Sequence, residues 1–122
     1  MGGWSSERPI SLRSGNAVIA GLKEADCDPV PLDLKDSMTV REEIERAGLD
    51  AAFIALHGHF GEDGGIQTLL DKLGIPYTGS SAEASRKAMN KGIFRKIVTE
   101  AGIRMPEGIV LKTENGEWRM EN

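Results

Sequence analysis

The sequence predicts an α/β layered domain with a largely parallel sheet. Two patterns support this fold: apolar residues recur at helical spacing in several segments, and short apolar runs alternate with those segments. The run "AAFIAL" at 51–56 is continuously apolar, which is typical of a parallel strand that is buried on both faces. A chain of 122 residues is long enough for one domain with its own core.

Five segments have helical periodicity. Each places apolar residues three or four positions apart, so that one face of the helix can pack against a sheet. The expected helices are 12–25, 40–47, 66–73, 81–89 and 91–101. Gly74 and Pro76 end the third of these helices, and Gly102 ends the last.

Four extended segments alternate with the helices: 29–34, 51–56, the short "PYTG" at 76–79, and 107–112. The prolines of the first segment suit an edge strand or the start of a strand. The polar tail after residue 112 is expected to be frayed.

Composition and charge exclude several classes of function. The net charge is −4, with 15 basic against 19 acidic residues and no basic cluster, which disfavours a nucleic-acid partner. Cys27 is the only cysteine, so no internal disulfide forms, and no cluster of residues has the spacing of metal ligands. No apolar stretch resembles a membrane span or a signal peptide, and the cytoplasm is the expected compartment.

The stretch "FIALHGHFGEDGG" at 53–65 places polar residues and glycines directly after an apolar strand. Ligands of open α/β sheets bind outside the carboxyl ends of the strands, so His57 is either a ligand contact or a hydrogen-bonded turn residue. The helix that follows can offer free N–H groups to an anion. Glu62 and Asp63 are expected to cap that helix, and His59 to be exposed.

A second glycine- and serine-rich loop, "GGWSSER" at 2–8, precedes the first helix. Its carboxylate, Glu7, can receive a ligand ammonium group or can be a solvated acid of the first helical turn. The sequence contains no G-x-G-x-x-G after a strand, no P-loop and no G-x-S-x-G. Dehydrogenase, P-loop and serine-hydrolase functions therefore have no specific support.

Three stretches, in this order, resemble the N-terminal part of D-alanine–D-alanine ligases: "GGWSSERPISLRSG", "FIALHGHFGEDGGIQTLLDKLGIPYTGS" and "SRKAMNKGIFRKIVTEAGIRMPEGIVL". The resemblance covers about residues 2–112. It implies a three-layer α/β domain with an open, mostly parallel sheet, the Rossmann-like domain that precedes an ATP-grasp fold, here lacking the family's first strand. Residues 1–104 would form this domain, and 105–122 would begin the central ATP-grasp domain.

The resemblance also implies an activity and its residues. The family uses ATP and Mg²⁺ to join two D-alanines through an acyl phosphate, for peptidoglycan synthesis. Glu7 matches the glutamate that anchors the ammonium group of the first D-alanine, and His57 matches a histidine near its carboxylate. Ile10 and Ser11 fall at substrate-binding positions, Ile10 beside the second substrate. Lys91 matches a lysine that reaches an ATP phosphate.

Relative to the family, the chain is expected to be truncated at both ends. The apolar strand that precedes the "GG" loop is missing, which would leave unpaired sheet edges that a second copy or the strand at 107–112 fills. Pro9 stands where the family often has an acid, which changes the charge near Glu7. The nucleotide clamp and the magnesium-binding acids are also missing. We therefore expect a homodimer that has no ligase activity by itself.

Other interpretations remain open at this point. A non-catalytic, truncated domain acting in dimerisation or regulation is one alternative, and a ligase that makes D-alanine–D-lactate or D-alanine–D-serine is another. The residues that choose the second substrate lie mostly beyond residue 122 in the family.

Overall fold

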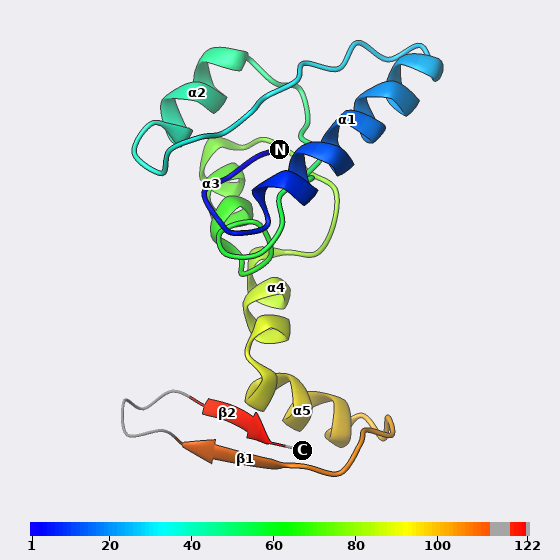
Figure 1. The fold of residues 1–122 in the computed structure, drawn as a ribbon, viewed down its shortest axis with the longest axis vertical. Coiled ribbons are helices and arrows are strands. Elements are labelled where there is room, and N and C mark those ends of the chain that lie inside the picture. Colours follow the sequence, from blue (N-terminus) through cyan, green and yellow to red (C-terminus); the bar gives the residue numbers. More distant parts are fainter. Residues whose placement is uncertain (113–117, 122) are drawn as a thin grey trace.

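Five helices and a two-stranded hairpin make up the part of the chain described here, residues 1–112 and 118–121, in a computed structural model. The elements are α1 (Arg8–Glu24), α2 (Val40–Ala47), α3 (Gly65–Leu73), α4 (Ala82–Met89), α5 (Lys91–Glu100), β1 (Ile109–Lys112) and β2 (Trp118–Glu121). In Figure 1, α1, α2 and α3 form an upper body, and α4 leads from this body to α5 and the hairpin.

The five predicted helices are confirmed, and α2 has the predicted bounds. The first helix starts at Arg8 instead of residue 12. Pro9 lies in its first turn, where a residue without a backbone N–H is tolerated because that N–H has no partner within the helix. Side-chain caps start the last two helices: Ser81 Oγ accepts from Ala84 N at 3.3 Å, and Asn90 Oδ1 accepts from Ile93 N at 3.0 Å.

The predicted three-layer, mostly parallel sheet is not confirmed. Segments 29–34 and 51–56 run through the body without forming strands, and they take part only in two isolated parallel bridges, Gly2 with Leu34 and Ala52 with Tyr77. Within residues 1–112 and 118–121, the one sheet is the antiparallel pair β1–β2.

At the C-terminal end of the chain, one expectation is confirmed and one is wrong. The strand expected at 107–112 is confirmed as β1. The expectation of a frayed tail is wrong for β2, which forms an antiparallel pair with β1. Ile109 lies opposite Glu121 at one end of the pair, and Lys112 lies opposite Trp118 at the other. Residues 113–117 and 122 of that tail lie outside the described part of the chain.

An apolar groove borders the two body segments that were expected to be strands. It has a volume of about 770 Å³ and is lined by α1 and by both extended segments of the body. Met1 begins a parallel ladder at its mouth: the Met1 amine donates to Leu32 O at 2.9 Å, Leu34 N donates to Met1 O at 3.0 Å, and Gly3 N donates to Leu34 O at 2.7 Å. Among residues 1–112 and 118–121, segments 29–34 and 51–56 share no strand partner beyond the two isolated bridges.

The pairing of β1 corrects one expectation about the edges of the predicted sheet. Because β1 pairs with β2, the proposal that segment 107–112 fills the gap is wrong. Filling by a second copy of the chain stays a prediction.

Burial beside the groove lowers the pKa of the Met1 amine, and Arg8 acts in the same direction, although the nearby Asp33 carboxylate opposes them.

A buried hydroxyl joins the pieces of the body. Ser11, in α1, is fully buried. Its Oγ accepts from Gly2 N at 2.8 Å and donates to Ala55 O at 2.6 Å. Beside it lies a cluster of buried aliphatic side chains from the extended segments, α2 and α3: Leu34, Val40, Ile44, Leu56, Ile66 and Leu70. The core therefore forms although the strands that should cross it do not.

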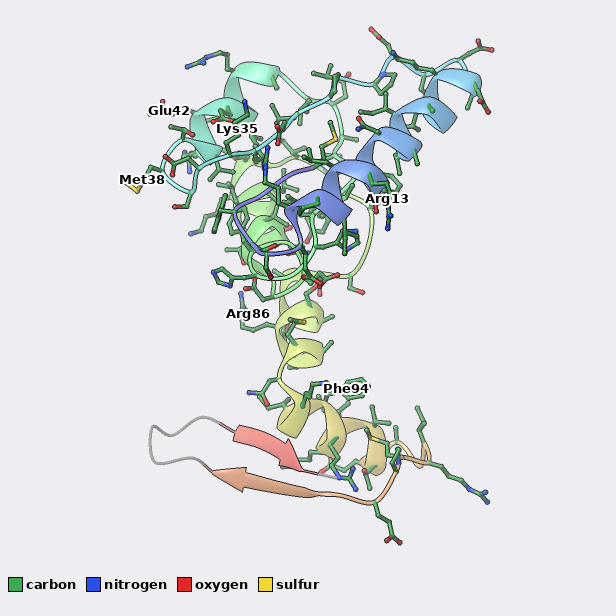
Figure 2. All side chains as sticks on the ribbon, in the orientation of Figure 1. Arg13, Lys35, Met38, Glu42, Arg86 and Phe94 are labelled. Carbon is green, nitrogen blue, oxygen red and sulfur yellow. The ribbon has the colours of Figure 1, made fainter. Side chains whose placement is uncertain are left out.

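The lower part of the chain is held to the body through α4. Arg86, labelled in Figure 2, donates from Nη2 to Thr68 Oγ1 of α3 at 3.2 Å. Helix α5 contacts α4 and β2 and buries none of its side chains; Phe94, also labelled in Figure 2, is 40% exposed. The predicted domain boundary between 104 and 105 stays a prediction, although it would separate α5 from the hairpin that α5 contacts.

A short apolar extension added before Met1 is expected to stabilise the fold by about 1–3 kcal/mol. Each buried aliphatic side chain contributes about 1.5–3 kcal/mol, and ordering the backbone takes back about 1–2 kcal/mol per residue. Urea unfolding measures the gain, with a glycine–serine extension of equal length as the control. Equal stability of the two extended chains would contradict the groove as a strand site.

Ser11→Ala is expected to destabilise the fold by about 1–3 kcal/mol, because Gly2 N and Ala55 O would both lose a buried hydrogen-bond partner. Urea unfolding measures the loss. Ser80→Ala, at an exposed serine, is the matched control and should stay within about 0.5 kcal/mol of the parent chain. Similar losses in the two variants would show that the Ser11 hydroxyl does not join these segments.

Candidate functional site

The two glycine-rich loops that the sequence singles out lie against each other. The rings of Trp4 and Phe60 are 4.8 Å apart between centroids. Ser5 Oγ donates to the backbone oxygen of His57 at 3.0 Å. An aromatic contact and a hydrogen bond therefore join the loop before α1 to the loop before α3.

Glu7 reaches His57's neighbour, Gly58. Gly58 has φ +70°, in the left-handed region, and a β-carbon at this position would overlap Glu7 Oε2 and lie 3.3 Å from Ser5 Oγ. Only glycine combines this backbone conformation with so close an approach. The Glu7 carboxylate thus packs on the residue that follows His57.

The His57 ring lies between two polar side chains. Its Nδ1 is 3.4 Å from Glu62 Oε1, and its Nε2 is 3.2 Å from Ser14 Oγ of α1. A third of the His57 side chain is exposed. The ring is therefore oriented by protein groups at both nitrogens while part of it stays open to solvent.

Asp63 caps α3, as predicted. Its Oδ1 accepts from Gly65 N and its Oδ2 from Phe60 N, both at 3.0 Å. Burial alone would raise the pKa of Asp63, but these two N–H groups and the His59 imidazole, 2.6 Å away, outweigh burial and lower the pKa. His59 is exposed, as expected.

Two expectations about the same turn are wrong. Glu62 does not cap α3: its Oε2 accepts from Gly58 N at 2.9 Å, on the His57 side of the turn. The first two N–H groups of α3 are not offered to an anion either. Gly65 N donates to Asp63, and Ile66 N donates to Phe60 O at 2.8 Å, so the chain's own oxygens occupy that position.

Comparison with known proteins finds similarity to D-alanine–D-alanine ligases. A family model described as "D-ala D-ala ligase N-terminus" matches residues 33–80. The chain is 50% identical over 107 residues to a D-alanine–D-alanine ligase of Desulforudis audaxviator, and 45% identical over 115 residues to one of Gluconobacter oxydans. These matches cover 88% and 93% of the chain. Over nearly its whole length, the chain is similar to the N-terminal part of D-alanine–D-alanine ligases.

Solved structures of the family agree with the sequence matches. The D-alanine–D-alanine ligase of Bacillus anthracis, solved in complex with ATP, is 41% identical and superposes with a TM-score of 0.83 over 93% of the chain. The chain spans 38% of that ligase, and 34% and 38% of the two relatives above. The family is one of enzymes, and this chain spans about a third of the length of those members.

The ligase resemblance assigned three further site residues, which lie in different surroundings. Ile10, on the first turn of α1, is 46% exposed. Ser11 is fully buried and its hydroxyl is used by two backbone groups, so we leave it out of the proposed ligand contacts. Lys91 is exposed at the start of α5, in the lower part of Figure 1, and no described contact joins it to Glu7 or His57.

Ser14 and Glu62 are the site residues that the sequence patterns missed. Ser14 follows Glu7 by seven positions, or two helical turns, so a helix starting at Arg8 places it on the same face as Glu7. The helix start expected at residue 12 hid this relation. Glu62 was assigned to the helix because acids before a helix are usually caps.

Two classes of feature are not found among residues 1–112 and 118–121. No group of three or more His, Cys, Asp and Glu side chains in this part is arranged to hold a metal ion. None of its helices combines the length and the apolar character needed to cross a membrane.

The lowered pKa of Asp63 predicts a stability difference that depends on pH. A lowered carboxyl pKa stabilises the fold above the unfolded-state value, near 3.8, and this contribution is lost as the pH falls through the folded-state value. Asp63→Asn should therefore be less stable than the parent chain by about 1 kcal/mol near neutral pH, with the gap closing in acid. Urea unfolding across this pH range measures it, and a gap independent of pH would contradict the assignment.

Proposed function

We propose that the chain forms the N-terminal, substrate-side part of an ATP-dependent D-alanine–D-alanine ligase and supplies part of the first D-alanine site. The observation that carries the proposal is that the Glu7 carboxylate packs on Gly58, the residue after His57, so that both side chains come from two loops in contact. A carboxylate and an imidazole on such a pair of loops suit an amino acid, which carries an ammonium and a carboxylate group.

The proposed chemistry asks mainly for positioning and charge neutralisation. Glu7 anchors the ammonium group of the first D-alanine, and His57 lies near its carboxylate. ATP phosphorylates that carboxylate, and the amine of the second D-alanine attacks the acyl phosphate and releases inorganic phosphate. The exposed Ile10 provides an apolar contact beside the second substrate. The product serves peptidoglycan synthesis, and the reaction takes place in the cytoplasm, where ATP is supplied.

The nucleotide part of the proposal rests on Lys91 and on a relative. The Bacillus anthracis ligase was solved with ATP, and Lys91 is an exposed cation at a helix start, where it can contact a phosphate. We place the Mg²⁺ ligands in the part of the family protein that this chain does not span. Completion of the site therefore depends on residues outside this sequence.

A dimer is the second part of the proposal. The groove beside Met1 and the exposed apolar side chains of α5, including Ile93 and Ile97, favour association with another protein surface. We propose that the chain forms a homodimer through the groove or through α5. The same two surfaces would support the alternative, a non-catalytic domain that acts in dimerisation or regulation.

The chain alone is expected to release no phosphate above background from ATP and D-alanine, while still binding D-alanine weakly. Isothermal titration measures the binding and a phosphate-release assay measures turnover. Glu7→Ala and His57→Ala should each remove the binding, whereas Ser80→Ala should leave it unchanged. Turnover by the chain alone, or binding that survives both site variants, would contradict the proposal.

A chimera tests the same site in a working enzyme. Residues 2–112 replace the matching segment of the Bacillus anthracis ligase, and the chimera should retain ligase activity. Glu7→Ala in the chimera should raise the KM for D-alanine by about 10- to 100-fold, because a charge-assisted hydrogen bond contributes about 1.5–3 kcal/mol.

A further inference from the structure

Glu62 links the His57 ring to the backbone of the loop that carries it. One carboxylate oxygen lies 3.4 Å from His57 Nδ1, and the other accepts from Gly58 N at 2.9 Å. Because the two oxygens meet different groups, the carboxylate is held in one orientation. This arrangement was not expected from the sequence, where Glu62 was assigned to the cap of α3.

The contact with Glu62 decides which nitrogen of His57 carries the proton. An ionised carboxylate only accepts hydrogen bonds, so the Nδ1 beside it must be the donor. In the neutral ring, Nε2 is then the acceptor, and Ser14 Oγ, 3.2 Å away, can donate to it. The hydrogen bond at one ring nitrogen thus fixes the state of the other.

We propose that Glu62 is the positioning residue of this site, holding the neutral His57 ring as the Nδ1–H tautomer with Nε2 at Ser14 Oγ. Protonation of this oriented ring would make Nε2 a donor toward a ligand carboxylate. The tautomer itself follows from the contacts, and only the identity of the ligand rests on the proposed function. Glu62 also supports the second side of the site. Its bond to Gly58 N fixes the residue on which the Glu7 carboxylate packs.

Nitrogen NMR of the chain's two histidines tests the inference directly. In the neutral ring, long-range ¹H–¹⁵N spectra distinguish a protonated from an unprotonated nitrogen, and the parent chain should show His57 with Nδ1 protonated. Glu62→Ala should convert His57 to the Nε2–H form or to a mixture. Glu62→Gln has one oxygen for two donors: when that oxygen accepts from Gly58 N, the NH₂ group faces Nδ1, so this variant should also move His57 toward the Nε2–H form.

His59 provides a control within the same spectrum. It is exposed and pairs with Asp63 instead of Glu62. Glu62→Ala should leave the His59 signals in place, and Asp63→Asn should move the His59 signals while His57 keeps its tautomer. If Glu62→Ala leaves His57 protonated at Nδ1, the inference is overturned.

Ser14→Ala provides a second, independent variant. If Glu62→Ala fails to fold, the folded Ser14→Ala chain decides the question: retention of Nδ1–H supports Glu62 as the residue that sets the tautomer, and its loss assigns the tautomer to Ser14. Neither result depends on what the site binds.

D-alanine titration separates this inference from the proposed function. Glu62→Ala should weaken D-alanine binding about tenfold, because the His57 ring loses the hydrogen bond that orients it. Absence of D-alanine binding in the parent chain would count against the proposed ligand, while the tautomer result would still decide the role of Glu62. A changed tautomer with unchanged D-alanine affinity would overturn its positioning role toward D-alanine.

Discussion

The buried hydroxyl of Ser11 holds together the three pieces from which the body is built. It joins α1 to the N-terminal loop through Gly2 N and to the apolar segment through Ala55 O. In a complete sheet these backbone groups would be satisfied by neighbouring strands. Here the Ser11 hydroxyl provides the hydrogen-bond partner for both backbone groups, and the buried aliphatic cluster forms around segments that are not regular strands.

The helices of this chain were predictable because their signals are local. Apolar spacing and terminal glycines or caps are contained within each segment, and the five predicted helices form. The sheet was not predictable in the same way, because a strand needs a partner from elsewhere in the chain. Segment 51–56 has the composition of a buried strand and does bury Ala55 and Leu56, yet its one bridge in the described residues is that of Ala52 with Tyr77.

The site shows the same division between local and tertiary signals. Glu7 and His57 were recognisable from their loops and from the family motifs, and the structure brings those loops together. The role of Glu62 depends on which of two nearby donors its carboxylate meets, the helix start or Gly58 N. Sequence spacing permits both. Asp63, one residue later, already occupies the helix start, so Glu62 is left to the backbone of Gly58 and to His57.

Helix α1 and segment 51–56 connect the groove to the candidate site. Met1 packs on α1 at Gly15, where a β-carbon would overlap the Met1 side chain, and it borders the groove. Ser11, one turn earlier on α1, bonds to Ala55, two residues before His57. The groove and the site loops therefore share two elements, α1 and segment 51–56, which carry Glu7 and His57 at their ends.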